Sequence, residues 1–192
     1  MERSPELIAH MDFHPVPAAE RQTPGRVKSV PARLYIDKFT EHREAYAFLQ
    51  QQQDLHGEGS KTMVRALLHY RDDIILPLSE LRERQAASGR RNHAIPDKCL
   101  IARLAFRPVP ANARHTPGRV KHVSARLYID KYVEHRDAYE FIASQQELHG
   151  EGLKTLVRAL LHYRDTIIRP LQLDAVDTGK PQLALDVDGA RR

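Results

Sequence analysis

The feature that most constrains this chain is an internal repeat. Residues 13–77 align without a gap on residues 106–170, at an offset of 93 positions, and roughly seven in ten aligned residues are identical. Both copies contain Thr-Pro-Gly-Arg-Val-Lys, Leu-His-Gly-Glu-Gly and Val-Arg-Ala-Leu-Leu-His-Tyr-Arg-Asp, so polar positions are retained together with apolar ones. The chain is therefore a tandem duplication of one structural unit.

Each copy contains the segment Ala-Arg-Leu-Tyr-Ile-Asp, at residues 32–37 and again at 125–130. Leucine and isoleucine alternate there with arginine and tyrosine, which predicts a β-strand with one apolar and one polar face. A strand this short is not stable by itself, because its apolar face and its backbone groups need a partner. We expect the strand of one copy to pair with the strand of the other.

Two helices are predicted after each strand. In copy one the first spans residues 41–55, and the His-Gly-Glu-Gly segment ends it. The second begins near Ser60 and runs to about Ile75, where Pro77 is expected to break or kink it. The apolar residues expected to form the core are Ala45, Phe48, Leu49, Val64, Leu67, Leu68, Ile74 and Ile75, with Val157, Leu160, Leu161, Ile167 and Ile168 in copy two.

The repeat divides the chain into five parts. We expect a mobile, proline-containing arm over residues 1–29, the first copy over 30–77 and the second over 123–170. Residues 78–122 are interpreted as a linker in which the helix can extend past the kink and which ends in a second basic arm. Residues 171–192 are predicted to be a disordered tail.

Composition limits the class of protein. The single cysteine, Cys99, lies between the copies, which excludes an intrachain disulfide and favours a reducing compartment. No apolar run approaches the length of a membrane span, and the N-terminal residues lack a signal-peptide pattern, so a cytoplasmic protein without a membrane partner is expected. The formal charge of +5 permits an anionic partner without requiring one.

A basic segment, a strand, a helix, a glycine turn and a second helix follow one another in each copy, and this order resembles the ribbon-helix-helix family of MetJ- and Arc-like DNA-binding proteins. The resemblance covers about residues 33–75 and 126–168. Within the family, Leu-Tyr-Ile-Asp, Glu-His-Arg-x-Ala-Tyr and Val-Arg-Ala-Leu-Leu-His-Tyr resemble plasmid-partition proteins of the ParR type. The resemblance implies a mainly α fold with a short β-ribbon, in which the two copies form an intramolecular pseudo-dimer.

In that family the antiparallel ribbon enters the DNA major groove. The resemblance implies base-reading roles for the outward side chains Pro31, Arg33, Tyr35, Ser124, Arg126 and Tyr128. Arginine suits this role because its guanidinium can bond O6 and N7 of guanine together. Phosphate contacts are expected from the basic arms and from the start of each second helix, namely Arg26, Lys28, Ser60, Lys61, Thr62, Arg119, Lys121, Lys154 and Thr155.

Other chemistries are weaker interpretations of the same residues. The segment from Gly57 to Thr62 differs from a nucleotide-binding P-loop, which has glycine directly before its lysine, where this chain has Ser60. Eleven histidines are present, but His42, His56 and His69 and their copies lack metal-ligand spacing and are interpreted as surface or helix-end residues. We expect no enzyme activity, no cofactor and no metal.

The resulting functional prediction is sequence-specific binding of double-stranded DNA, as a transcriptional repressor or as a partition or mobile-element accessory protein. Such a protein would be cytoplasmic and associated with a bacterial nucleoid or plasmid. It could self-associate on adjacent sites, and the linker or the tail could bind a protein partner. The alternative is a non-catalytic protein–protein interaction module in which Arg33 and Arg126 only increase solubility.

Overall fold

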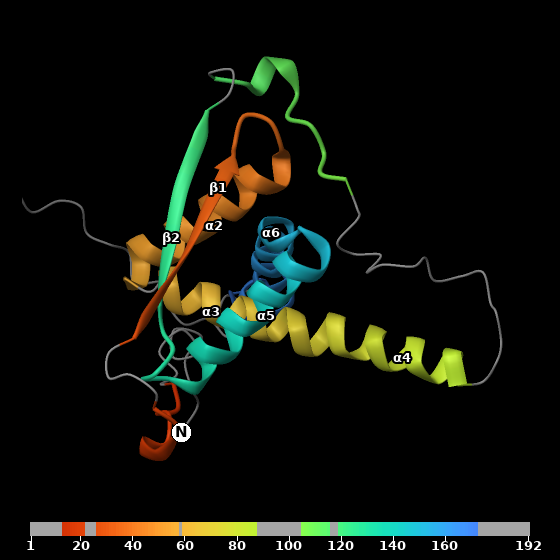
Figure 1. Cartoon of the computed structure of the whole chain (residues 1–192). Coiled ribbons are helices and arrows are strands. Elements are labelled where there is room, and N and C mark those ends of the chain that lie inside the picture. Colours follow the sequence, from red (N-terminus) through yellow and green to blue (C-terminus); the bar gives the residue numbers. More distant parts are fainter. Residues whose placement is uncertain (1–12, 22–25, 58, 88–104, 116–118, 173–192) are drawn as a thin grey trace, which may run out of the picture.

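The computed structural model describes residues 13–21, 26–57, 59–87, 105–115 and 119–172 (Figure 1). The protein is mainly helical, with one two-stranded antiparallel sheet, as the sequence predicts. Among the described residues, no helix combines the length and the apolar character needed to cross a bilayer. Residues 1–12 and 22–25 of the predicted arm, 88–104 and 116–118 of the predicted linker and 173–192 of the predicted tail lie outside the described residues.

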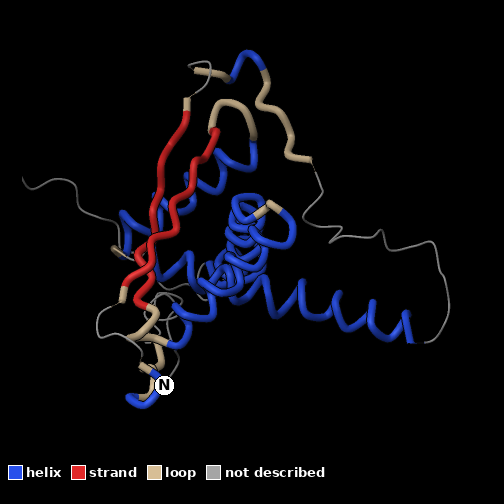
Figure 2. Tube along the Cα trace, in the orientation of Figure 1, coloured by secondary structure: helices blue, strands red, loops and turns tan. Residues whose placement is uncertain are grey.

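The sheet is a ribbon made by the two copies of the repeat. Strand β1 (Val27–Tyr35) pairs antiparallel with β2 (Val120–Tyr128), and the two strands lie side by side in Figure 2. Pro31 lies opposite Ser124, and these two residues are equivalent positions of the repeat. An approximate two-fold axis therefore passes through the middle of the ribbon and relates one copy to the other.

Both strands begin earlier than the sequence predicts. The alternation extends back to Val27, so residues 27–29 belong to the ribbon and not to a mobile arm. This part of each strand was missed because the residues before Ala32 and Ala125 were interpreted as parts of arms. Pro31 lies within β1 although proline cannot donate a ladder hydrogen bond. It is tolerated here because each strand of a two-stranded ribbon has one free edge. The strand likewise ends at Tyr35, with Ile36 and Asp37 buried in the turn that follows.

Helices of both copies cover one face of the ribbon (Figures 1 and 2). In copy one they are α2 (Thr40–His56), α3 (Gly59–Tyr70), the π-helical turn η2 (Arg71–Ile75) and α4 (Leu76–Ala87). In copy two they are α5 (Val133–His149), α6 (Gly152–Tyr163), the π-helical turn η4 (Arg164–Ile168) and a last helical turn at 169–172. The two predicted helices of each copy are confirmed.

The helix does not break at Pro77 but extends past it, which is one of the two outcomes expected from the sequence. The chain passes from α3 through η2 into α4 without leaving helical geometry, and Figure 1 shows α4 projecting from the rest of the helices. The cause is the wider π turn, in which the Leu76 N–H reaches back to the Arg71 carbonyl. Proline lacks an N–H and crowds the preceding turn, so a locally widened helix accommodates it.

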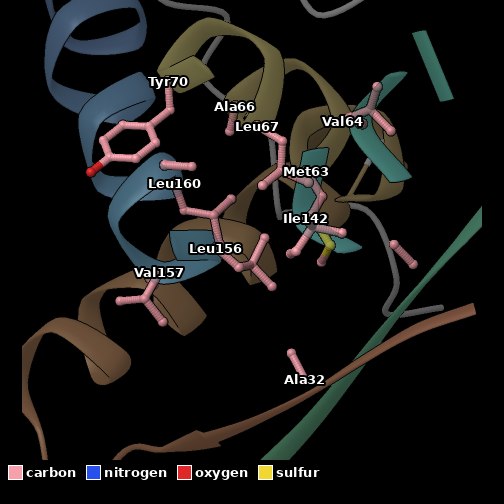
Figure 3. Packing of buried hydrophobic residues seen from close by; sticks show 14 of the residues in the cluster. Ala32, Met63, Val64, Ala66, Leu67, Tyr70, Ile142, Leu156, Val157 and Leu160 are labelled. Atoms are coloured by element: carbon pink, nitrogen blue, oxygen red, sulfur yellow. The ribbon is translucent and has the colours of Figure 1, made fainter. Parts of the chain in front are cut away.

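The core lies between the ribbon and the helices. Leu34 and Leu127 from the ribbon and Leu67 and Leu160 from α3 and α6 are at most 1% exposed. Figure 3 shows Leu67 and Met63 of α3 near Leu156 and Leu160 of α6, with Ala32 of the ribbon below them. Burying each leucine stabilises the fold by about 1.5–3 kcal/mol, so both copies contribute to one common core.

The repeated His-Gly-Glu-Gly segment is explained by backbone geometry. Gly57 and Gly150 end α2 and α5 with φ of 66° and 64°, a left-handed conformation that side chains disfavour. Gly59 and Gly152 begin the next helices, where an added Cβ would lie 2.9 Å and 3.0 Å from the side-chain oxygens of Gln53 and Gln146. Both glycines of the segment therefore have a structural reason.

The residues before each strand form an ordered strap, which corrects the prediction of a mobile arm for residues 13–21. These residues pack against copy two, and residues 105–115 pack against copy one. The Val16 N–H donates to the Lys131 carbonyl at 3.0 Å, and the Val109 N–H donates to the Lys38 carbonyl at 3.0 Å. Val16 and Val109 are each 1% exposed, so both straps are anchored in apolar surroundings.

Each strap also caps the first helix of the other copy. The Thr40 and Val133 N–H groups donate to the carbonyls of Arg107 and His14 at 2.9 Å each. The side chain of Arg107 bonds the Glu41 carboxylate at 2.8 Å. Neither helix has a side-chain N-cap, because backbone from the other copy satisfies its first amide.

We expect neither half to fold as a monomer. Residues 13–87 alone would expose a strand edge, an apolar helix surface and a strap whose binding surface belongs to the other copy. Circular dichroism and sedimentation velocity on this fragment should find an unfolded chain or a homodimer, whereas the full chain should be a folded monomer in the absence of DNA. A stable folded monomer of one half would contradict this expectation.

Candidate nucleic-acid interface

The ribbon face opposite the helices is exposed along its length. Alternation places Val27, Ser29, Pro31, Arg33 and Tyr35 of β1 on this face, together with His122, Ser124, Arg126 and Tyr128 of β2. The six side chains expected to read bases are therefore brought together on one surface. We call these nine residues the outer ribbon face.

The two arginines of the outer ribbon face are related by the approximate two-fold axis. Arg33 lies two residues beyond Pro31, opposite His122, and Arg126 lies two residues beyond Ser124, opposite Ser29. Neither arginine forms an ion pair with a residue that the structure describes, and no aspartate or glutamate occurs in either strand. Their guanidinium groups are exposed donors on a surface without competing carboxylates.

Ser29 and His122 belong to the outer ribbon face although the sequence did not predict them there. Ser29 Oγ and Ser124 Oγ share a hydrogen bond of 2.7 Å across the middle of the ribbon. Ser29 and His122 were missed because the two strands were predicted to start at Ala32 and Ala125. The alternation of Val30, Ala32 and Leu34 with the exposed positions between them was the signal that could have found them.

Lysines flank the outer ribbon face on both sides. The Lys28 ammonium lies 5.6 Å from the Tyr139 ring centroid, and the Lys121 ammonium lies 5.6 Å from that of Tyr46. These two lysines were expected in flexible arms, but they are strand residues on the helix-facing side, and the aromatic rings hold their charged ends. Arg26 and Arg119, which directly precede the strands, are exposed.

A pocket with a mainly apolar lining lies beyond the end of β1. A cavity of about 410 Å³ is lined there by Tyr35, Asp37, Lys38, Phe39, Pro108, Arg114 and Arg119. Asp37 is the one acid in this lining, and its carboxylate is paired with Arg43 at 2.8 Å. The lining also contains three cationic residues, Lys38, Arg114 and Arg119. The strap contributes Arg114, which sequence reasoning missed because the strap was expected to be mobile.

The first turns of α3 and α6 only partly match the expected phosphate sites. Thr62 and Thr155 are 2% exposed, so their hydroxyls cannot reach a backbone outside the protein, which corrects that prediction. The Gly59 and Gly152 N–H groups donate to the side-chain oxygens of Gln53 and Gln146 at 3.0 and 3.1 Å. These amides are therefore not available to an anion.

Each of these turns contains one lysine, Lys61 in copy one and Lys154 in copy two. Lys154 is paired with Glu151 at 2.8 Å and remains about two-fifths exposed. Lys61 lies close enough to His135 to help lower the pKa of that imidazole, and His135 in turn contacts Tyr128 at the end of β2. The start of α3 therefore lies beside one end of the ribbon, where Lys61 and half-buried Ser60 can reach a flanking group.

Two of the repeated histidines support the ribbon from inside. His42 and His135 are 2% and 3% exposed, which corrects the expectation of surface residues. Their Nδ1 atoms accept the N–H groups of Tyr35 and Tyr128 at 3.1 Å, so each ring is in the tautomer without a proton on Nδ1. The rings of Phe106 and Phe13 from the straps meet them edge-on at 4.7 and 4.6 Å.

Comparisons of this chain with protein-family models, with curated proteins and with solved structures find no match. The function must therefore be inferred from the geometry of the ribbon and its surroundings.

The two buried histidines predict a pH-dependent stability. Burial lowers the pKa of each imidazole from 6.5 to about 4, so the unfolded state binds more protons between these values. The stability contributed by the neutral rings is complete above pH 6.5 and is lost as the pH falls toward 4. Urea unfolding should give a midpoint that decreases on acidification through this range.

The upper part of this pH range separates the protonation of the histidines from that of the neighbouring carboxylates. The pKa values of the Glu41 and Glu134 carboxyls are lowered from 4.5, since bonds from Arg107 and His14 outweigh the opposing effect of burial. These acids therefore change protonation only at lower pH. A midpoint that stayed constant between pH 6.5 and pH 5 would contradict neutral, buried imidazoles.

Proposed function

We propose that this chain is a tandem ribbon-helix-helix protein that binds double-stranded DNA sequence-specifically through the outer ribbon face in the major groove. It would act as a transcriptional repressor or as a partition or mobile-element accessory protein. The observation that carries the proposal is the two-fold-related pair Arg33 and Arg126, exposed and without ion-pair partners in the described residues, on a ribbon face that contains no acid.

Shape and chemistry support the major groove as the docking site. A groove about 12 Å wide admits a two-stranded β-ribbon, whose outward side chains then meet base edges. Arg33 and Arg126 can each bond O6 and N7 of one guanine, and Ser29, Ser124 and His122 add shorter polar groups near the middle of the ribbon. Tyr35 and Tyr128 lie at the two ends, where they can reach a thymine methyl or a phosphate.

The surrounding cations support binding to the DNA backbone. Lys28 and Lys121 emerge at opposite ends of the antiparallel ribbon, and Arg26 and Arg119 precede them. Groups so placed meet phosphates on both sides of a groove, which orients the ribbon without reading sequence. Phosphate contacts of this kind release counterions, so the affinity should decrease steeply with salt concentration.

The symmetry of the ribbon predicts the symmetry of its site. Because Arg33 and Arg126 lie on opposite sides of the axis, the preferred DNA should be roughly palindromic. The centre departs from symmetry, since Pro31 offers no donor whereas Ser124 offers a hydroxyl. The central base pairs should therefore be read by one copy more than by the other.

The Arg33→Ala and Arg126→Ala variants test base reading. Removing each bidentate contact should weaken binding to the selected DNA by about 1–3 kcal/mol and relax the preference in one half of the site. Selection of bound fragments from a random duplex pool, followed by fluorescence anisotropy, measures both effects. Stability should change little, because both side chains are exposed.

Arg84→Ala is the matched control, since Arg84 is an exposed arginine on α4 and its removal changes the net charge equally. It should leave affinity and preference nearly unchanged. If the Arg33 and Arg126 double variant is folded and still binds like the parent, the proposed reading role is wrong. If no duplex binds with a salt-dependent affinity, the chain is better described as a protein–protein interaction module.

The Lys61→Ala and Lys154→Ala double variant tests the positioning role of the helix starts. It should weaken binding to all duplexes alike, and each phosphate contact that it removes should reduce the slope of log affinity against log salt by about one unit. Loss of sequence preference would instead assign base reading to these lysines.

A further inference from the structure

A second cluster of polar side chains lies where the second helices of the two copies meet. Helices α3 and α6 pack against each other, and the equivalent residues His69 and His162 face one another there. Their rings are stacked, with centroids 5.3 Å apart and an angle of 25° between the planes. Each copy supplies one histidine, so the pair exists only because the two copies fold together.

Asp73 completes this cluster. Its Oδ2 lies 3.0 Å from Nε2 of His69 and 3.7 Å from Nε2 of His162. All three ligand atoms lie within 4.8 Å of one another. We call His69, Asp73 and His162 the inter-copy triad.

We propose that the inter-copy triad binds a divalent transition-metal ion of the zinc class. Two imidazole nitrogens and one carboxylate oxygen are ligands that Zn²⁺, Co²⁺, Ni²⁺ and Cu²⁺ accept, whereas Mg²⁺ and Ca²⁺ prefer sets of oxygens. Three protein ligands leave a coordination position for solvent. The three side chains are partly exposed, the Asp73 side chain more than the two histidines.

Two of the three separations between the ligand atoms are close to those in a tetrahedral coordination shell. Metal–ligand bonds of about 2.0–2.1 Å place neighbouring tetrahedral ligand atoms about 3.3 Å apart. The two separations from Asp73 are 3.0 and 3.7 Å, and the two histidine nitrogens lie within 4.8 Å of each other, so the side chains would have to rotate to surround an ion. Nε2 of His162 is buried without a hydrogen-bond partner among the described residues, so this ring nitrogen is not committed to another group there.

The charges around the triad also permit a cation. The neighbouring arginines are already held by acids, with Arg71 at 2.7 Å from Asp72 and Arg164 at 2.7 Å from Asp165 and 3.1 Å from Glu44. Thr166 occupies the position in copy two that Asp73 occupies in copy one. Its hydroxyl donates to the His162 carbonyl at 2.8 Å and lies 3.1 Å from Nε2 of His69, so the site has one carboxylate and one neutral oxygen.

Metal bound here would tie α3 to α6 and so tie the two copies together. Because a folded triad has both histidines in place and the unfolded chain does not, binding should stabilise the folded state in proportion to the logarithm of metal concentration. This role is independent of DNA binding, since none of the three residues lies on the outer ribbon face.

The experiment uses the full chain without an affinity tag, first treated with a chelator and then dialysed. Titration with Co²⁺ followed by visible absorption reports the ligand set and geometry, and calorimetric titration with Zn²⁺ gives the affinity. We expect one tight site per chain and a Tm that rises with Zn²⁺ but not with Mg²⁺. The double variant His69→Ala with His162→Ala should lose this site and the rise in Tm.

Three single variants make the test sharper. Asp73→Asn keeps the shape of the side chain and should weaken Zn²⁺ binding by at least about tenfold. Thr166→Asp restores the carboxylate that symmetry would supply and should tighten it. His115→Ala is the matched control, because His115 is exposed and lies outside the triad, and it should leave the tight site unchanged.

The outcomes separate a metal site from an ordinary helix-surface hydrogen bond. If Asp73→Asn and Thr166→Asp leave the Zn²⁺ affinity of the folded chain unchanged, the triad is not the site and the proposal fails. The proposal also fails if the parent shows only weak binding of several ions per chain, as scattered surface histidines would give. If the His69→Ala with His162→Ala variant does not fold, the Zn²⁺ affinities of Asp73→Asn and Thr166→Asp decide whether the triad is the metal site.

Discussion

The antiparallel pairing of β1 with β2 around Pro31 and Ser124 is the constraint on which the rest of the molecule depends. Because equivalent residues meet at its centre, the pairing imposes an approximate two-fold relation on everything attached to the strands. It directs Leu34 and Leu127 into one core and Arg33 and Arg126 to the opposite face. A slip of one residue would exchange these faces and bury the arginines, so the burial of the leucines favours the observed register.

Each strap packs on the copy opposite the strand that it precedes, so the two copies are held together by more than the ribbon and the core. Residues 13–21 precede copy one in the chain yet pack on copy two, and residues 105–115 follow copy one yet pack on it. The aromatic residues Phe13 and Phe106 reach the buried histidines of the opposite copy, and those histidines accept the backbone N–H at the end of each strand. The geometry of Tyr35 and Tyr128 is therefore set by side chains that come from both copies.

The elements with strong local signals could be predicted from the sequence, and the features that depend on contact between the copies could not. The repeat, the alternation from Ala32 and the helical spacing of Ala45, Phe48 and Leu49 identified the strand partner, the helices and their buried faces. The strand start at Val27 was missed because residues 1–29 were interpreted as a proline-containing arm. Extension of the helix past Pro77 was expected, but the sequence does not show the π turn that precedes the proline.

The residues of the candidate site likewise fall into those that a local pattern predicts and those that depend on packing. Alternation alone predicted that Arg33 and Arg126 are exposed, and the structure agrees. The burial of Thr62 and Thr155 could not be predicted, because the rotation of a helix about its own axis is decided by what it packs against. The straps and the pair His69 and His162 join residues far apart in the chain, and no single-copy spacing contains that information.

The presence of both strands in one chain has a consequence for dilution. A ribbon assembled from two separate chains dissociates when the chain concentration falls below the dissociation constant. A protein of that kind loses its ribbon surface when few molecules are present. Here the partners are joined covalently, and the fraction of molecules with an intact ribbon does not depend on how many molecules are present. A protein built in this way keeps its complete outer ribbon face even at a few copies in a cell.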